Sequence, residues 1–152
     1  MTDQKIGRIS WDEYHNMILD IADQITSNKE PLPDEVVAIG RGGFVPGVHL
    51  SHLLGIPLRP LMWQTRDMPQ DVEDTPTIAP WEKRFISNVH SLIVDDINDS
   101  GKTLTQLTTE NIWNDTISVA VLMSKTISEF KAVDYYSQIA DNDVWYVFPW
   151  EH

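Results

Sequence analysis

The 152-residue chain contains no cysteine, so it has neither a disulfide framework nor a thiolate metal site. Such a composition is typical of a reducing compartment. Basic residues are also scarce, with 11 Lys and Arg against 23 Asp and Glu and a formal net charge of −12. Because a nucleic-acid backbone requires a basic face, we expect no nucleic-acid partner.

Long apolar runs are missing as well. The chain has no stretch of 18 apolar residues and no apolar signal segment after a basic start. We therefore expect a soluble, cytoplasmic protein that does not associate with a membrane. A length of 152 residues is sufficient for one hydrophobic core, which predicts a single domain over residues 1–152.

The hydrophobic pattern alternates between strands and helices. Ser10 and Glu13 form a capping-box pattern ahead of a predicted helix over 11–26. Further helices are predicted over 45–54 and 102–112, and strands over 35–39, 57–63, 92–94, 117–123, 135–139 and 144–148. This order predicts an α/β fold with a parallel sheet flanked by helices. The acidic segment 64–87 lacks periodicity and is long for a loop, which predicts a mobile lid.

Residues 92–103, Leu-Ile-Val-Asp-Asp-Ile-Asn-Asp-Ser-Gly-Lys-Thr, are the most informative segment. A predicted apolar strand ends at two adjacent carboxylates, and a small-residue turn then begins a helix. Side chains at the carboxyl ends of parallel strands face a ligand crevice, and a helix N-terminus favours phosphate. Carboxylates would repel that phosphate unless a divalent cation lay between them or they faced sugar hydroxyls. The segment therefore predicts a ligand that combines phosphate, polyol and metal.

Two other interpretations of this segment compete. Gly101-Lys102-Thr103 matches the end of a P-loop, but that motif requires a glycine five residues earlier, where this chain has Asp96. Asp99 or Ser100 could instead be the N-cap of the next helix. Capping leaves the two adjacent carboxylates unexplained.

The same segment resembles the motif of type I phosphoribosyltransferases that binds 5-phosphoribosyl 1-pyrophosphate (PRPP). Two other segments, in the order of the family, strengthen the resemblance, which spans about residues 10–151. Ala-Ile-Gly-Arg-Gly-Gly-Phe-Val-Pro-Gly at 38–47 is similar to the pyrophosphate loop of the bacterial xanthine–guanine (6-oxopurine) group. Val-Trp-Tyr-Val-Phe-Pro-Trp-Glu at 144–151 is similar to its purine-stacking segment.

The resemblance implies a pentosyltransferase of purine salvage. Such an enzyme transfers ribose 5-phosphate from PRPP to xanthine, guanine or hypoxanthine and releases pyrophosphate, with Mg²⁺ as its cofactor. It also implies a lid over about 64–87, a base-binding hood over about 124–152, and a homo-oligomer, either a dimer or a tetramer.

The resemblance further implies which residues bind PRPP. Asp95 and Asp96 would face the ribose hydroxyls and Mg²⁺. Arg41, followed by Gly42, would bind pyrophosphate. The Gly40–Arg41 peptide is expected to be strained or cis. The 5-phosphate would rest on the turn formed by Asp99, Ser100, Gly101, Lys102 and Thr103, with Gly101 allowing close backbone approach.

For the base, Trp145 would stack on the purine and the Tyr146 backbone would read its edge. Lys125 follows a predicted strand, and its ammonium group would donate to a 6-oxo group but not suit the amino group of adenine. Asp99 would act as the catalytic residue, near purine N7, by moving the displaced proton.

The lid departs from the family pattern. Xanthine–guanine enzymes carry a Ser-Tyr pair at its start, whereas this chain has Trp63-Gln64-Thr65-Arg66. This departure keeps open the alternative of a PRPP-binding regulatory protein with little catalysis. A transferase acting on a pyrimidine or another small base is a second alternative.

Overall fold

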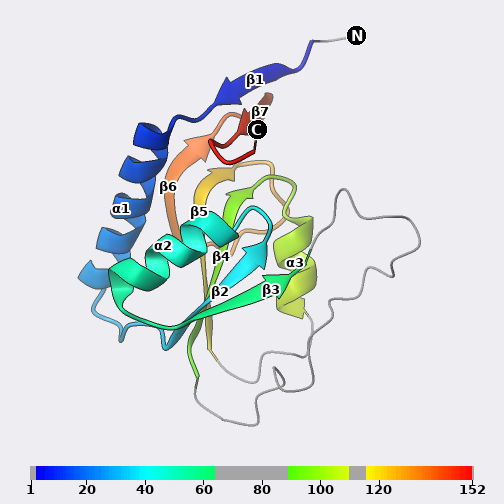
Figure 1. Cartoon of the computed structure of the whole chain (residues 1–152). Helices are drawn as coiled ribbons and strands as arrows, with labels where there is room; N and C mark the ends of the chain where they lie inside the picture. The colour runs from blue at the N-terminus through cyan, green and yellow to red at the C-terminus, as the bar shows by residue number, and fades with distance from the viewer. Residues whose placement is uncertain (1–2, 64–88, 110–115, 152) are drawn as a thin grey trace.

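The fold is built on a five-stranded sheet in which all neighbouring strands are parallel, as predicted. A computed structural model describes residues 3–63, 89–109 and 116–151 of the chain (Figure 1). The strand order is β3-β2-β4-β5-β6. The strands are β2 (Glu35–Gly40), β3 (Leu58–Met62), β4 (Ser91–Asn98), β5 (Ile117–Lys125) and β6 (Tyr135–Ala140).

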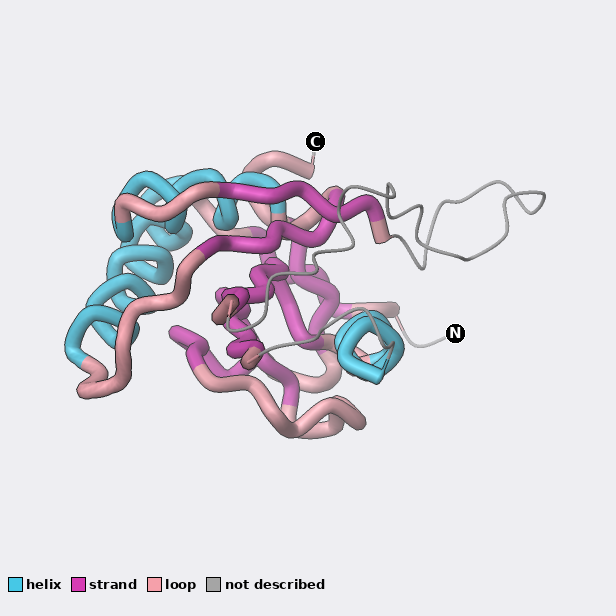
Figure 2. Tube along the Cα trace, turned by 90° about the horizontal axis from the view of Figure 1, so that it is seen from below, coloured by secondary structure: helices cyan, strands magenta, loops and turns pink. Residues whose placement is uncertain are grey.

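Helices cover both faces of this sheet. Helices α1 (Trp11–Ser27) and α2 (Phe44–Leu54) lie on one face, and α3 (Lys102–Thr109) lies on the other (Figures 1 and 2). Because successive strand residues point to opposite faces, Val36 packs in the core beneath α1 and α2. Val37 packs with Leu104 and Leu107 of α3 in a second core.

Local signals set the ends of the helices. The predicted capping box before α1 is present: Glu13 N donates to Ser10 Oγ at 3.1 Å, and Ser10 N donates to Glu13 Oε2 at 2.7 Å. Helix α2 ends at Gly55, whose φ of 66° lies in the left-handed region that glycine tolerates.

Strand β4 is longer than predicted. The expectation that the strand ends at Val94, before the two carboxylates, is wrong, since β4 continues to Asn98. Strand β5 likewise continues beyond Met123 and offers backbone partners, with Asp95 beside Val121 and Asn98 beside Ser124. Lys125 is consequently the last residue of β5 rather than a residue that follows it.

A second, two-stranded sheet lies near the carboxyl ends of β4 and β5 (Figure 1). It pairs β1 (Lys5–Arg8) with β7 (Val144–Val147) in parallel. No strand is predicted at β1, whose side chains are mostly exposed and show no alternating pattern. Strand β6 falls within the predicted hood range 124–152 but is an edge strand of the main sheet.

Some predictions fall beyond the described residues. The predicted lid, 64–87, lies outside them, as does the predicted end of the third helix at 110–112. Trp63, the residue just before the lid range, is buried in the core beside α3. Within the described part of the chain, no helix is long and apolar enough to cross a membrane.

Candidate active site

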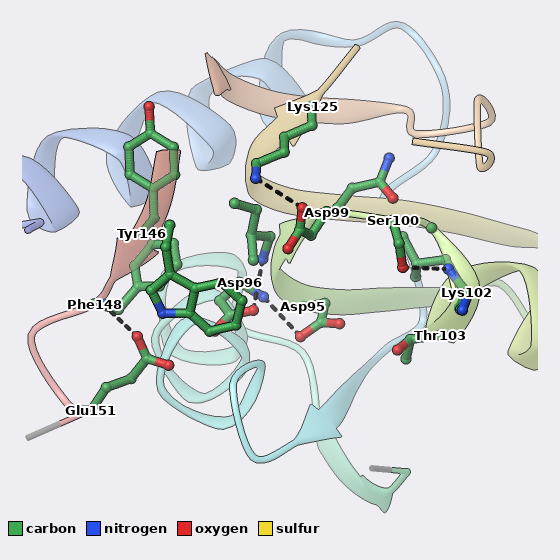
Figure 3. A pocket seen from close by; sticks show the side chains of 15 residues that line it. Asp95, Asp96, Asp99, Ser100, Lys102, Thr103, Lys125, Tyr146, Phe148 and Glu151 are labelled. Carbon is green, nitrogen blue, oxygen red and sulfur yellow. Dashed lines mark hydrogen bonds and ion pairs between the residues drawn. The ribbon is translucent and has the colours of Figure 1, made fainter. Parts of the chain in front are cut away.

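One cavity of about 420 Å³ brings together three separate segments of the chain (Figure 3). They are the carboxyl end of β4 with the turn into α3, the last residue of β5, and β7 with the residues after it. The predicted site residues that line it are Asp95, Asp96, Asp99, Ser100, Gly101, Lys102, Thr103, Lys125, Trp145 and Tyr146.

Asp95 and Asp96 form the acidic part of the cavity. Asp96 N donates to Asp95 Oδ1 at 2.9 Å, and Ile97 N donates to Asp96 Oδ1 at 2.7 Å. Burial raises the pKa of Asp95 well above its usual value, and the charge of Asp96 raises it further. Burial also raises the pKa of Asp96, and the charge of Glu151 adds to this effect. The pair therefore lies where a cation or hydroxyl donors from a ligand would stabilise the charged form.

The turn after β4 presents backbone groups at the start of α3. Gly101 has a φ of 87°, which strongly favours glycine. A Cβ there would lie 2.4 Å from Ser128 Oγ, so the loop after β5 already fills that side of Gly101. Packing and φ, rather than an approach of phosphate from that side, thus require glycine. Lys102 N donates to Ser100 Oγ at 3.4 Å at the start of α3, and a helix N-terminus of this kind favours an anion.

The loop at 40–43 lies against this acidic centre. The Gly40–Arg41 peptide is cis, in line with the expectation from the sequence. A Cβ on Gly42 would lie 2.3 Å from Asp96 Oδ2, so the loop backbone touches the carboxylate directly. Arg41 and Gly42 are nevertheless not among the described residues that line the cavity. Gly42 borders the cavity through Asp96.

Lys125 and Asp99 meet at the other end of the cavity. Lys125 Nζ lies 2.9 Å from Asp99 Oδ1 and donates to the carbonyl oxygen of Asn142 at 3.3 Å. The lysine side chain is 6% exposed and the aspartate side chain 26%. The ammonium is therefore the more buried partner of the pair, and the carboxylate is the more exposed one.

The aromatic side of the cavity comes from β7 and the residues after it. Trp145 is partly exposed and lines the cavity. The hydroxyl of Tyr146 accepts a hydrogen bond from Asp141 N at 3.1 Å, and its side chain points away from the aspartates (Figure 3). Tyr146 is therefore placed to offer its backbone rather than its hydroxyl to a ligand.

The set of predicted site residues leaves out five residues of the lining, namely Ile97, Asn98, Leu104, Phe148 and Glu151. Phe148 N donates to Glu151 Oε2 at 2.6 Å, which folds the chain end back onto the cavity. All five residues lie within or next to the matched segments. Treating each segment as a continuous lining would have found them.

Comparisons with known proteins identify the family of this chain. The model of the phosphoribosyl transferase domain family matches residues 10–151. The chain is 30% identical to xanthine-guanine phosphoribosyltransferase from Cereibacter sphaeroides, covering 97% of this chain and 88% of that protein.

Solved structures share the fold. A purine phosphoribosyltransferase from Pyrococcus horikoshii superposes with a TM-score of 0.74 and 29% identity, covering 96% of this chain and 94% of that one. A xanthine-guanine-hypoxanthine phosphoribosyltransferase from Helicobacter pylori superposes with a TM-score of 0.69 and 20% identity, covering 95% and 92%. The match of the family model over nearly the whole chain, together with the 30% identical relative, shows that the chain belongs to the phosphoribosyltransferase family of enzymes.

Proposed function

We propose that the protein transfers ribose 5-phosphate from PRPP to a 6-oxopurine (xanthine, guanine or hypoxanthine) and releases pyrophosphate. The observation that carries this proposal is the meeting of Lys125, Asp99 and the β4–α3 turn in one cavity. In the reaction the C1–pyrophosphate bond breaks, a bond forms between C1 and a purine nitrogen, and that base loses a proton. The site must bind an anionic sugar at one end and a base at the other, which this arrangement allows.

The turn from Asp99 to Thr103 is the proposed site of the 5-phosphate. Its backbone N–H groups and the N-terminus of α3 supply donors and positive partial charge. The hydroxyls of Ser100 and Thr103 border the same cavity and add donors. Lys102 is exposed at the first position of α3, where its ammonium group adds positive charge and its side chain is not held in one conformation by burial.

Asp95 and Asp96 are the proposed ligands of the ribose hydroxyls and of Mg²⁺. Among the described residues, no group of three or more His, Cys, Asp or Glu side chains is arranged to hold a metal. Two carboxylates still fit Mg²⁺, since this ion is often bound by one or two carboxylates together with substrate phosphates and water. When bound, Mg²⁺ would neutralise charge on the pyrophosphate, which an acidic site otherwise repels.

Arg41 and Gly42 are proposed to hold the pyrophosphate. A guanidinium group can form paired hydrogen bonds with phosphate oxygens. The contact between Gly42 and Asp96 supports this role, because it places the loop next to the proposed Mg²⁺ ligands. The leaving group would thus lie between the loop and the acidic centre, where charge develops as the bond breaks.

Lys125, Trp145 and Tyr146 are the proposed base-binding residues. The indole of Trp145 would stack on the purine, and the backbone of Tyr146 would contact the ring edge. Lys125 would donate to the 6-oxo group, and its buried ammonium could not pair with the 6-amino group of adenine. Asp99, which remains open to the cavity beside Lys125, would accept the proton from the base.

Assembly and domain layout complete the proposal. We propose one phosphoribosyltransferase domain over residues 1–152, with its base-binding hood in the C-terminal part, and a homodimer or homotetramer. The resemblance to the family motivates this assembly, and exposed apolar side chains such as Val48, Leu53 and Met62 are available for a subunit interface. Light scattering behind size exclusion would test it, and a monomeric mass at micromolar concentration would contradict it.

The activity is tested by incubating the protein with PRPP, Mg²⁺ and each base in turn, and following nucleotide by chromatography. We expect nucleotide from at least one 6-oxopurine and little from adenine. Calorimetric binding of PRPP with no product from any base would favour the regulatory alternative. Product from a pyrimidine alone would favour the transferase for another base.

A further inference from the structure

Asn98 is a buried amide at the point where β4 enters the phosphate-binding turn. Only 2% of the residue is exposed. Its Nδ2 donates to Ser124 Oγ at 3.1 Å and to the carbonyl oxygen of Phe130 at 3.0 Å. Its Oδ1 accepts from Ser128 Oγ at 2.7 Å. Both amide ends are therefore satisfied, as a buried amide requires.

Ser128 is the second member of this network and is 1% exposed. Its hydroxyl donates to Asn98 Oδ1 and accepts from Phe130 N at 3.2 Å. The carbonyl oxygen of Phe130, at 3.4 Å, is a second and longer acceptor for the same hydroxyl. A residue that can both donate and accept is needed there, and alanine would leave the Asn98 oxygen and the Phe130 N–H unpaired.

The loop at 126–131, which carries Ser128, also holds the phosphate-binding turn directly. Glu129 N donates to the carbonyl oxygen of Ser100 at 2.9 Å. A Cβ on Gly101 would lie 2.4 Å from Ser128 Oγ and 2.5 Å from Phe130 N, so the two loops are in tight contact. The 126–131 loop therefore packs against the turn and supports its backbone.

The same network reaches the base end of the site. Ser124, which accepts from Asn98, immediately precedes Lys125, and Asn98 immediately precedes Asp99. Asn98 and Ser124 are also register partners in β4 and β5. One buried amide thus connects the two strand ends whose next residues form the ion pair between Lys125 and Asp99.

From these contacts we propose that Asn98 and Ser128 are positioning residues that hold the phosphate-binding turn and the Lys125–Asp99 pair in one geometry. Neither residue needs to touch the reacting atoms. They act through the backbone of Ser100 and Gly101 and through Ser124. This inference rests on the proposed function, because it assigns the turn to the 5-phosphate and the ion pair to the base.

The test compares Ser128→Ala with Ser118→Ala. Ser118 is a matched control because it lies at the opposite end of β5, is also buried, and bonds to His90 Nε2 at 2.6 Å. We expect Ser128→Ala to raise KM for PRPP by about fivefold to tenfold and to lower kcat. Ser118→Ala should lower thermal stability about as much as Ser128→Ala does, but it should leave the KM for PRPP unchanged. A purely structural role predicts the same unchanged KM for both variants.

A second variant addresses the base end. Ser124→Ala removes one acceptor of Asn98 and should raise KM for the base more than KM for PRPP. If Ser128→Ala is folded and keeps the KM of the wild type for PRPP, or if Ser118→Ala shifts KM equally, the proposal is overturned. Should Ser128→Ala not fold, Ser124→Ala alone decides, and an unchanged KM for the base overturns the proposal.

Failure of the proposed function is recognised separately. If the wild type forms no nucleotide with any base, the transferase proposal fails, and calorimetric Kd values for PRPP with Mg²⁺ replace KM in the comparison of Ser128→Ala with Ser118→Ala. A weaker Kd in Ser128→Ala alone would still support the positioning role. Equal Kd values, or no binding of PRPP by the wild type, would overturn it.

Discussion

Lys125 and Asp99 form an ion pair, with Nζ 2.9 Å from Oδ1, across the ends of two neighbouring strands. The two residues lie 26 positions apart, and only Asp99 belongs to one of the matched segments. The pairing explains how one site could combine base selection with proton transfer. The ammonium contacts Asp99 and the carbonyl oxygen of Asn142, and the carboxylate is the more exposed partner.

Asp99→Asn tests the proton role. The amide keeps the shape of the carboxylate and can still accept from Lys125, but it cannot take a proton from the base. We expect kcat to fall by about 10²–10⁴-fold, with little change in the Kd for PRPP. Steady-state kinetics and calorimetry would measure both, with Asp20→Asn on the exposed side of α1 as a control. Equal losses in kcat and PRPP affinity would contradict the assignment.

Lys125→Ala tests base selection. Without the ammonium, the site no longer leaves a buried donor unmatched when adenine binds. The ratio of kcat/KM for the preferred 6-oxopurine to that for adenine should fall by about tenfold or more. Competition assays with both bases would measure the ratio, and the exposed Lys29→Ala should preserve it. Unchanged selectivity in Lys125→Ala would remove this role.

Gly101→Ala and Gly55→Ala separate backbone strain from packing. Both glycines have positive φ, but a Cβ on Gly55 meets nothing within 4 Å, whereas one on Gly101 meets Ser128 and Phe130. We expect Gly55→Ala to lower the free energy of unfolding by about 1–2 kcal/mol. Gly101→Ala should lower it further and weaken PRPP binding. Urea unfolding and calorimetry would measure the two effects, and equal destabilisation by the two variants would contradict the packing role.

The lowered pKa of His49 predicts that the folded protein loses stability in mild acid. Burial lowers the pKa of His49 below its ordinary 6.5, and the nearby positive charges of His15 and His52 lower it further. As the pH falls below 6.5, the unfolded chain takes up the proton first, so the free energy of unfolding decreases until the folded His49 also titrates.

The measurement is urea unfolding of the wild type and His49→Gln at pH 7.5 and at mildly acidic pH. Glutamine can still accept a hydrogen bond from the Tyr14 hydroxyl, which lies 3.1 Å from His49 Nδ1. We expect a smaller drop in stability for the variant than for the wild type. A drop of the same size in both proteins would show that His49 does not contribute.

Much of the fold follows from local sequence. The alternation of apolar strands and amphipathic helices predicts the parallel sheet, and Ser10 with Glu13 predicts the start of α1. These signals act between residues close in sequence, where capping and periodicity decide the conformation. The sequence pattern predicts ends for β4 and β5 that are too early, because most of the last residues are polar. Backbone pairing between the two strands keeps these residues in the sheet.

The sequence by itself determined the order of elements and the residue types of the site: two adjacent carboxylates, a turn that contains glycine, and the N-terminus of a helix. Only the tertiary structure decided that Lys125 pairs with Asp99, that β1 joins β7, and that Asn98 connects to Ser128. Each of these contacts joins residues far apart in the chain. Their ordering entropy is offset by burial of the whole core rather than by any local preference, so no short sequence pattern can specify them.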